Sequence, residues 1–275
     1  AMRQDHDHRF GARLEADRHE TQLLEFSVSR NSSRATWVGG AAYQIDQYRA
    51  DTPPEFNYRY RVPALFGQLD YDLSDDVSIA ASTRGDSHSQ YGAQLSPRVS
   101  LLYRPGNWTL RGSLGRGFYA PTPFIEETEA TGLFALTPLE DLEVEHAQTA
   151  SFDLGYSEGS IEAGVTLFAS EVDNAITAIP TPYKKVRLVN SSKATQTRGI
   201  DALLRWRRES FVITASYLAL DATEQLDETQ LRRQVSLTPK QSVGLVAMWE
   251  QHGVGRVGLE LYYTGEQSLW DNPYR

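Results

Sequence analysis

The stretch SPRVSLLYRPGNWTLRGSLGRGFYAPT, residues 96–122, decides the expected fold. Residues 97–103 and 108–114 alternate apolar and polar side chains, which is typical of β-strands with one apolar face. The residues between them, Arg104-Pro105-Gly106-Asn107, have the composition of a tight turn. A long loop then precedes the next alternating segment, residues 147–156. Two strands with a short turn at one end and a long loop at the other form the unit that the chain repeats.

The same alternation recurs along the chain, most clearly over residues 161–170, where Ile161, Val165 and Leu167 alternate with residues such as Glu162 and Thr166. These segments predict an antiparallel meander of about 13 strands. The further expected strands are 10–16, 24–28, 37–45, 65–73, 77–81, 200–206, 211–217, 243–249 and 257–263.

The connections between these strands fall into two length classes. Short turns are expected at 31–34, 74–76, 104–107, 157–160, 207–210 and 251–254, and another near 17–19. Long loops, most of them rich in Pro, Glu and Thr, are expected at 47–60, 85–95, 123–146, 174–196 and 221–238. Short turns at one rim and long loops at the other are typical of a transmembrane β-barrel, with periplasmic turns and extracellular loops.

Composition supports this interpretation and excludes others. The chain has 5 Trp, 14 Tyr and 10 Phe, and several of the Tyr and Trp residues lie near the expected strand ends, as the aromatic girdles of a barrel require. No apolar run approaches the roughly 18 residues of a membrane-spanning helix, whereas a membrane strand needs only about 9–11 alternating residues. A formal charge of −9 argues against nucleic acid as a partner. The absence of cysteine excludes disulfides and thiolate metal sites.

The alternative fold is a soluble sandwich or propeller, in which alternation packs two sheets together. Two features favour the barrel instead: many polar-face residues are charged or Gly, and the strands exceed the usual length of about five or six residues. No signal peptide is recognised. Residues 1–8 are expected to be a disordered tail or a remnant of cloning, with a metal site at His6 and His8 as the alternative.

Several motifs resemble the barrel of TonB-dependent outer-membrane receptors. Residues 96–105 and Gly115-Arg116-Gly117-Phe118-Tyr119-Ala120-Pro121-Thr122 are similar to the family's strand that ends in a Phe-Arg-Ala-Pro-like motif, although Tyr119 stands where Arg is usual. Residues 142–145 keep the Leu and the last Glu of a Leu-x-Pro-Glu-like motif, with Val144 in place of Pro. Further matches lie at 189–190, 197–201, 237–242, 262–267 and 272–275.

This resemblance implies a 22-stranded barrel with an N-terminal plug and a TonB-coupling box. Because neither the plug nor the last strands are found, residues 9–275 are expected to be a barrel fragment, coupled to TonB through the missing N-terminal region. The expected location is the bacterial outer membrane, in contact with lipid. Two open strand edges are costly in lipid, so either partner fragments complete the barrel or the segment pairs in another way.

No catalytic residues are predicted, and neither is a cofactor, a metal or an enzymatic activity. The six His residues are dispersed, and no zinc-hydrolase motif, nucleophile elbow or phosphate loop occurs. Glu126, Glu127 and Glu129 with acidic residues of 140–145 suggest a cation site or, as the alternative, a solvated loop.

The resemblance instead implies capture of a small-molecule ligand such as a siderophore or cobalamin for energy-coupled uptake. Aromatic rings bury apolar ligand area while polar groups orient the ligand. The expected ligand-binding residues are Tyr58, Tyr60, Arg116, Tyr119, Phe124, Phe134, Tyr183 and Lys184, with Tyr48, Phe56 and Lys185 as further candidates. The alternative is that these rings only pack loops or anchor in lipopolysaccharide. A passive porin and a soluble carbohydrate-active domain remain the alternative functions.

Overall fold

The computed structural model describes residues 1–10, 13–51, 54–124, 132–182, 185–225 and 231–269. These residues form strands and two short 3-10 helices, η1 (Pro54–Phe56) and η2 (Leu133–Ala135). The strands are β1 (Met2–Phe10), β2 (Arg13–Asn31), β3 (Ala35–Ala50), β4 (Tyr58–Asp72), β5 (Val77–His88), β6 (Gly92–Tyr103), β7 (Trp108–Tyr119), β8 (Glu145–Glu158), β9 (Ile161–Asp173), β10 (Ile176–Thr181), β11 (Lys185–Asn190), β12 (Thr195–Arg208), β13 (Phe211–Glu224), β14 (Arg233–Gln234), β15 (Gln241–Gln251) and β16 (Gly255–Thr264).

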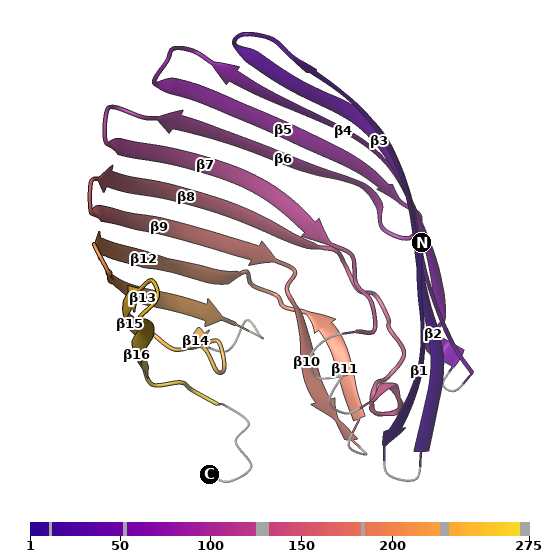
Figure 1. The fold of residues 1–275 in the computed structure, drawn as a ribbon. Coiled ribbons are helices and arrows are strands. Elements are labelled where there is room, and N and C mark those ends of the chain that lie inside the picture. Colours follow the sequence, from indigo (N-terminus) through magenta and orange to yellow (C-terminus); the bar gives the residue numbers. More distant parts are fainter. Residues whose placement is uncertain (11–12, 52–53, 125–131, 183–184, 226–230, 270–275) are drawn as a thin grey trace.

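Thirteen strands follow one another in a single curved sheet, in the order β1-β2-β3-β4-β5-β6-β7-β8-β9-β12-β13-β15-β16 (Figure 1). The short β14 pairs with β13, and β10 and β11 form a separate hairpin. All these pairs are antiparallel, for example β8 with β9. Because β1 and β16 lie at the two ends of the order, the described sheet is not closed. The predicted all-β antiparallel meander, a partial barrel of about 13 strands, is confirmed.

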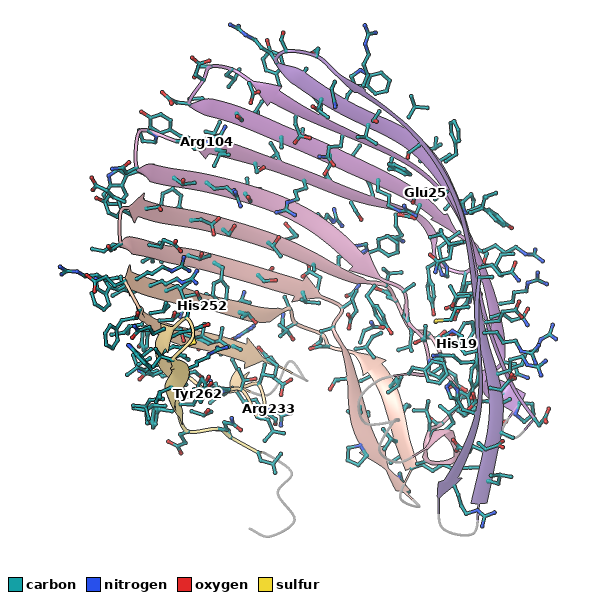
Figure 2. All side chains as sticks on the ribbon, viewed as in Figure 1. His19, Glu25, Arg104, Arg233, His252 and Tyr262 are labelled. Carbon is teal, nitrogen blue, oxygen red and sulfur yellow. The ribbon has the colours of Figure 1, made fainter. Side chains whose placement is uncertain are left out.

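The two faces of the sheet differ in chemistry. His19 and Glu25 of β2 lie on the concave side (Figure 2), so Leu24 and Phe26, which alternate with them, lie on the convex side. Both are largely exposed, at 74% and 70%. Directly opposite residues on neighbouring strands lie on the same face of the sheet. By this pairing, the convex face also includes Ile161, Val165 and Leu167 of β9 and the odd-numbered residues 257–263 of β16.

Polar contacts line the concave face. The Thr166 hydroxyl of β9 donates a hydrogen bond of 2.8 Å to Asp153 of β8. Arg84 lies over the Phe66 ring, with its guanidinium carbon 6.0 Å from the ring centroid. Apolar side chains outside and polar ones inside are the arrangement of a barrel wall with lipid around it and water within it.

Glycines let large rings lie flat against this wall. A Cβ atom at Gly199 would lie 2.6 Å from Cζ of Phe168 and 2.5 Å from the carbonyl oxygen of Ala219. Gly40 has the same relation to Phe66, at 2.5 Å. In both cases the aromatic residue is directly opposite the glycine on the neighbouring strand. The ring therefore covers the glycine backbone, and a larger residue in place of the glycine would displace the ring.

Six of the seven expected short turns are confirmed, but the strands extend further than predicted toward the long-loop rim. The turn expected near 17–19 lies inside β2, and the loop expected at 85–95 is only a turn at residues 89–91. Within the expected loop 47–60, β3 continues to Ala50 and β4 begins at Tyr58. Above the apolar band both faces are polar, so hydropathy no longer alternates although the backbone ladder continues.

The prediction of a disordered tail at residues 1–8 is wrong. Residues 2–10 pair with residues 13–21 as β1 and β2. Charge pairing stabilises this hairpin: Arg18 Nε donates to Asp5 at 2.7 Å, and His6 Nδ1 lies 3.2 Å from Asp17. Polar composition suggested disorder because these cross-strand pairs are not visible before the register is known.

A small buried core lies at the long-loop rim. Tyr48, Phe56, Leu133, Leu136 and Leu188 pack together there. They join the top of β3 to η1, to η2 and to the β10–β11 hairpin. No helix among the described residues is long and apolar enough to cross a bilayer.

Candidate ligand-binding site

Seven aromatic and imidazole rings gather on the concave face beside the longest loops, and we call them the rim cluster. It consists of His19 of β2, Tyr48 of β3, Tyr58 and Tyr60 of β4, His88 of β5, Tyr91 of the following turn and Phe124 of the loop after β7. Register explains the gathering, because Tyr48 is directly opposite both His19 and Tyr58. Tyr60 joins them because residues two apart share a strand face.

The rings contact one another in stacked and edge-on geometries. Tyr58 and Tyr60 stack with centroids 4.5 Å apart, and Phe124 meets Tyr48 edge-on at 4.7 Å. His88 lies 4.7 Å from Tyr60 and 5.1 Å from Tyr91. Such pairs stabilise by about 0.5–1.5 kcal/mol each beyond the area they bury. The cluster is therefore a continuous set of packed rings, in which Tyr48 and His88 are buried and the other rings are partly exposed.

Asp46 gives this surface a charged edge. Its carboxylate lies 2.6 Å from Nε2 of His19 and accepts hydrogen bonds of 3.4 Å from the hydroxyls of Tyr58 and Thr21. Burial, and secondly the nearby Asp46 charge, raise the pKa of Tyr58. Burial likewise raises the pKa of Tyr60, which lies above the apolar band with the rest of the cluster. Both phenols therefore stay protonated and are hydrogen-bond donors at neutral pH.

His88 is held in its neutral form. Its Nδ1 accepts hydrogen bonds of 3.2 Å from the backbone N–H groups of Gln90 and Tyr91. Burial lowers the pKa of His88, against the opposing influence of Asp46 and Asp86. A neutral imidazole with Nδ1 as acceptor is thus what shapes the turn that carries Tyr91.

The loop after β7 is tied to the cluster by hydrogen bonds. The hydroxyls of Tyr60 and Tyr91 both donate to the carbonyl oxygen of Pro121, at 3.4 and 3.3 Å. Further along the loop, the backbone N–H of Phe134 donates to the buried carboxylate of Glu15 at 2.9 Å. A ring displaced by a ligand would therefore move the loop with it.

The structure brings three of the eight predicted residues together. Tyr58, Tyr60 and Phe124 lie within the rim cluster. Tyr119 lies on the same face, close enough to act electrostatically on Tyr58 and Tyr60, and its hydroxyl is 3.2 Å from Thr122. Phe134 lies in η2. Tyr183 and Lys184 lie outside the described residues.

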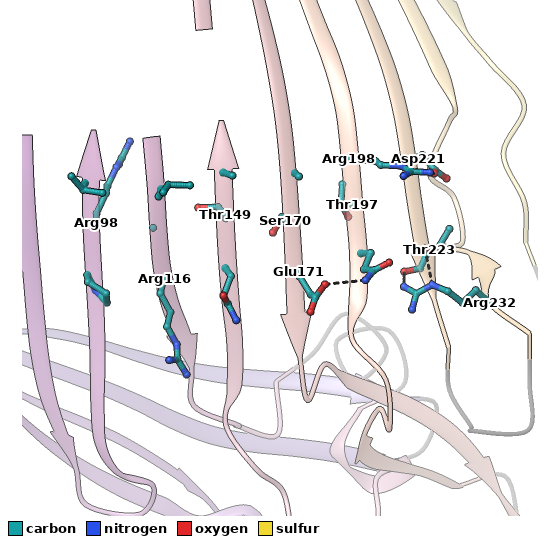
Figure 3. Close-up of a pocket in the computed structure, with 18 residues that line it drawn as sticks. Arg98, Arg116, Thr149, Ser170, Glu171, Thr197, Arg198, Asp221, Thr223 and Arg232 are labelled. Carbon is teal, nitrogen blue, oxygen red and sulfur yellow. Dashed lines mark hydrogen bonds and ion pairs between the residues drawn. The ribbon is translucent and has the colours of Figure 1, made fainter. Parts of the chain in front are cut away.

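Arg116 lies apart from the cluster. It shares the parity of Leu114 on β7, so it lies on the convex face. There it borders a hollow of about 810 Å³ whose lining includes Leu114, Ala150 and Ala169 (Figure 3). Across β8 from Arg116, the same hollow is lined by the Glu171–Gln196 hydrogen bond, of 2.9 Å, and by the Arg198–Asp221 ion pair.

Four members of the site were not predicted: His19, Asp46, His88 and Tyr91. The signal that could have found them is an alternation of polar and aromatic residues rather than of polar and apolar ones. Asp46-x-Tyr48, Tyr58-x-Tyr60 and Asp86-x-His88 each place two such residues on one strand face.

The site offers aromatic area, phenol donors and a carboxylate. Among the described residues, no group of three His, Asp or Glu side chains is arranged to hold a metal ion. The acidic residues Glu126, Glu127 and Glu129, for which a cation site was an alternative, lie outside the described part of the chain. The arrangement is suited to holding a large, partly apolar solute.

Comparison with known families decides the class of the protein. The model of the TonB dependent receptor-like β-barrel family matches residues 2–274. The chain belongs to this family. The family of TonB-dependent receptors comprises bacterial outer-membrane barrels that bind small molecules and interact with TonB, and it is not a family of enzymes, as predicted.

Solved structures with the TonB-dependent receptor fold are similar to the chain. The FrpB iron transporter of Neisseria meningitidis (F3-3 variant) has a TM-score of 0.72 at 11% identity, over 90% of this chain and 43% of its own. The siderophore receptor PirA of Acinetobacter baumannii has a TM-score of 0.71 at 13% identity, and the match covers 90% of this chain and 42% of PirA. A Q482A mutant of the ferric enterobactin receptor PfeA of Pseudomonas aeruginosa, in complex with enterobactin, has a TM-score of 0.72 at 14% identity. This match covers 93% of this chain and 43% of PfeA.

These likenesses are in fold. The chain spans less than half the length of these solved structures. No curated protein sequence matches the chain.

Proposed function

We propose that residues 9–275 are a section of the barrel of an outer-membrane receptor that captures a bulky solute, such as a ferric siderophore, for energy-coupled import. One observation carries this proposal: the rim cluster places Tyr58, Tyr60 and Tyr91 side by side on the concave face, next to the loops. A ligand arriving from the long-loop side would meet these rings first.

The chemistry of the cluster suits such a ligand. Aromatic faces bury the apolar parts of a solute, and a few fixed polar groups orient it. The phenol hydroxyls of the cluster donate to Pro121 and Asp46, which fixes the rings and leaves the phenol oxygens as hydrogen-bond acceptors toward a solute. Preorganisation of this kind reduces the entropic cost of binding.

The convex face supports the proposed location. Its alternating apolar residues, such as Leu24, Phe26 and Leu167, would face lipid, whereas the concave face would face a watery interior. Interaction with TonB is part of this proposal, as for other receptors of the family.

Ligand binding tests the proposal most simply. We would titrate the full-length receptor, in detergent, with ferric enterobactin, ferrichrome and cobalamin and follow intrinsic fluorescence. For a solute that binds at submicromolar Kd, Tyr60→Leu should weaken binding about tenfold, since base or ring stacking on an aromatic side chain contributes roughly 1–3 kcal/mol. The control is Tyr103→Leu, because Tyr103 is exposed on the convex face. Equal losses in both variants, or no binding of any probe, would refute the assignment.

Energy coupling needs a separate experiment. Uptake of the bound probe by cells should stop when the inner-membrane energiser is deleted, and uptake that continues would reject this part of the proposal. Steady ion conductance of the full-length protein in planar bilayers would instead support a passive porin.

A further inference from the structure

Three side chains of different chemistry converge at the charged edge of the rim cluster, and we call them the donor triad. His19 comes from β2, Asp46 from β3 and Tyr58 from β4. Nε2 of His19 lies 2.6 Å from one oxygen of the Asp46 carboxylate. The Tyr58 hydroxyl lies 3.5 Å from the same Nε2 and 3.4 Å from the other carboxylate oxygen. An imidazole nitrogen, a carboxylate and a phenol oxygen therefore face one another.

The sheet register holds the donor triad in place. Tyr48 of β3 is directly opposite both His19 and Tyr58, and Asp46 is one same-face step from Tyr48. All three side chains thus project from adjacent paired strands on the concave face, where Figure 2 labels His19. A site built on strands is held more precisely than a site built on loops.

The spacing of the three donor atoms fits one face of an octahedral metal ion. Ligand atoms about 2.1 Å from a metal lie about 3 Å apart when adjacent and about 4.2 Å apart when opposite. The three separations, from 2.6 to 3.5 Å, are those of adjacent ligands. The side chains of His19 and Asp46 are 29% and 21% exposed, so solvent reaches the triad. The protein would fill one face of the metal shell and leave the opposite face open.

The donor set favours ferric iron. Imidazole suits iron, carboxylate is a hard oxygen ligand, and tyrosine oxygen is among the ligands that proteins use for haem iron. The described residues hold no metal-binding group made of His, Asp and Glu alone, and here a phenol is the third donor. A metal ligand must be deprotonated, so binding has to displace the phenol proton of Tyr58. A trivalent ion repays that loss better than a divalent one, because its attraction to the phenolate is stronger.

We propose that the donor triad binds ferric iron directly and accepts iron complexes whose chelator leaves three adjacent coordination positions open. Neutral His19 would bind through Nε2 with its proton on Nδ1, and Asp46 and Tyr58 would each bind through one oxygen. The phenol proton passes to solvent, three waters leave the iron, and no electron is transferred. Capture of a saturated siderophore needs no protein ligand, so this inference goes beyond the proposed function although it uses the same rim.

The test titrates the full-length receptor, in detergent, with ferric iminodiacetate, a tridentate chelate. Wild type should bind it with the visible absorption and resonance Raman bands of iron-bound phenolate. Tyr58→Phe keeps the ring and removes the oxygen, so it should lose these bands. Its affinity for the chelate should fall at least about a hundredfold, since even outer-shell partners of a metal contribute roughly 10–100-fold. Tyr43→Phe is the matched control and should behave as wild type, because Tyr43 is exposed on the convex face opposite Leu24.

Two further variants test the other donors. His19→Gln and Asp46→Asn should each weaken binding of ferric iminodiacetate about tenfold or more. Their phenolate bands should shift but persist at saturation, because the Tyr58 oxygen is still present. The control is His252→Gln, since His252 is exposed at a short turn. Unchanged β-sheet circular dichroism would show that each variant is folded.

Three results would overturn the inference. One is equal binding of ferric iminodiacetate by wild type and Tyr58→Phe, which would mark the triad as a hydrogen-bonded network only. Another is iron-loaded wild type without phenolate bands. The third is zinc bound as tightly as ferric iron. Failure of ferric enterobactin, ferrichrome and cobalamin to bind, with the phenolate bands present, would refute the proposed function and leave this site standing. The converse pattern would refute this inference alone.

Discussion

The barrel wall and the long-loop rim are built on different principles. In the wall, strands such as β9 expose large apolar residues, including Ile161 and Leu167, and their order comes from the backbone ladder. At the rim, Tyr48 and Leu136 are each 2% exposed and pack in a core like that of a water-soluble protein. The described residues therefore leave the apolar face of the wall uncovered, whereas the rim covers itself.

This difference separates stability from recognition. Truncating a side chain on the convex face of the wall removes few packing contacts, because these side chains already point away from the protein. The rim core fixes the loop that holds Phe124 against Tyr48 and Pro121 against Tyr60. We expect substitutions at the rim to alter the candidate site while the sheet stays folded. Substitutions in the wall should change the stability of the whole sheet.

The largest effect should follow from opening the rim core. Leu136→Ala removes a buried side chain from the segment that follows η2, and such substitutions cost about 2–5 kcal/mol. We expect the loops to be cut faster by trypsin while the β-sheet circular dichroism and its thermal midpoint stay unchanged. Leu101→Ala, on the exposed convex face, is the control. If the sheet melts together with the loops, rim and wall are one cooperative unit and the comparison fails.

A smaller effect is expected in the wall. Gly199→Ala would place a Cβ 2.5 Å from the Ala219 carbonyl oxygen and 2.6 Å from Phe168. Overpacking of this kind costs roughly 1–3 kcal/mol. At Gly164 a Cβ would have no contact closer than 4.0 Å, so Gly164→Ala is the matched control. Urea unfolding in micelles should separate the two variants, and equal midpoints would show that the Phe168 ring yields without cost.

The smallest effect concerns pH at the rim. Burial lowers the pKa of His88 in the folded state, so the stability it contributes is present above about 6.5, the ordinary histidine value, and is lost as pH falls below it. Protonation would also remove the Nδ1 acceptor that holds Gln90 and Tyr91. We expect the near-ultraviolet tyrosine dichroism to weaken between about pH 7 and 5. His88→Asn should reduce this change, whereas His252→Asn, exposed at a short turn, should not. An identical pH profile in all three proteins would contradict the role of His88.

The sequence predicted the wall well because its two faces differ in polarity in a regular way. Wherever one face is apolar and the other polar, as over residues 161–169, period-two alternation located the strand. Turns at 104–107 and 207–210 carry Pro, Gly or charged residues of recognisable type. Above the apolar band this rule fails, so the extensions of β3 and β4, and the strand β1, were not recognised.

The site was predicted in part for the same reason. Tyr58, Tyr60 and Phe124 were found because aromatic residues in loops suggested ligand contact. His19 and Tyr91 were missed because each belongs to a strand or turn whose extent only cross-strand pairing fixes. Arg116 was assigned to the site by its position next to an expected outer loop, whereas its parity on β7 places it on the convex face.

The central claim is that odd-numbered residues of β9 face lipid and even-numbered residues face water. The chain contains no cysteine, so single cysteines can be placed at each position from 161 to 170 in the protein reconstituted into vesicles. The account predicts that a fluorescent label on a cysteine at 161, 163, 165, 167 or 169 is quenched by a lipid-phase reagent. Cysteines at 162, 164, 166 and 168 should instead react with a water-soluble maleimide. Protection of the odd-numbered set from both reagents would mean that a second layer of protein covers it, and this would contradict the barrel.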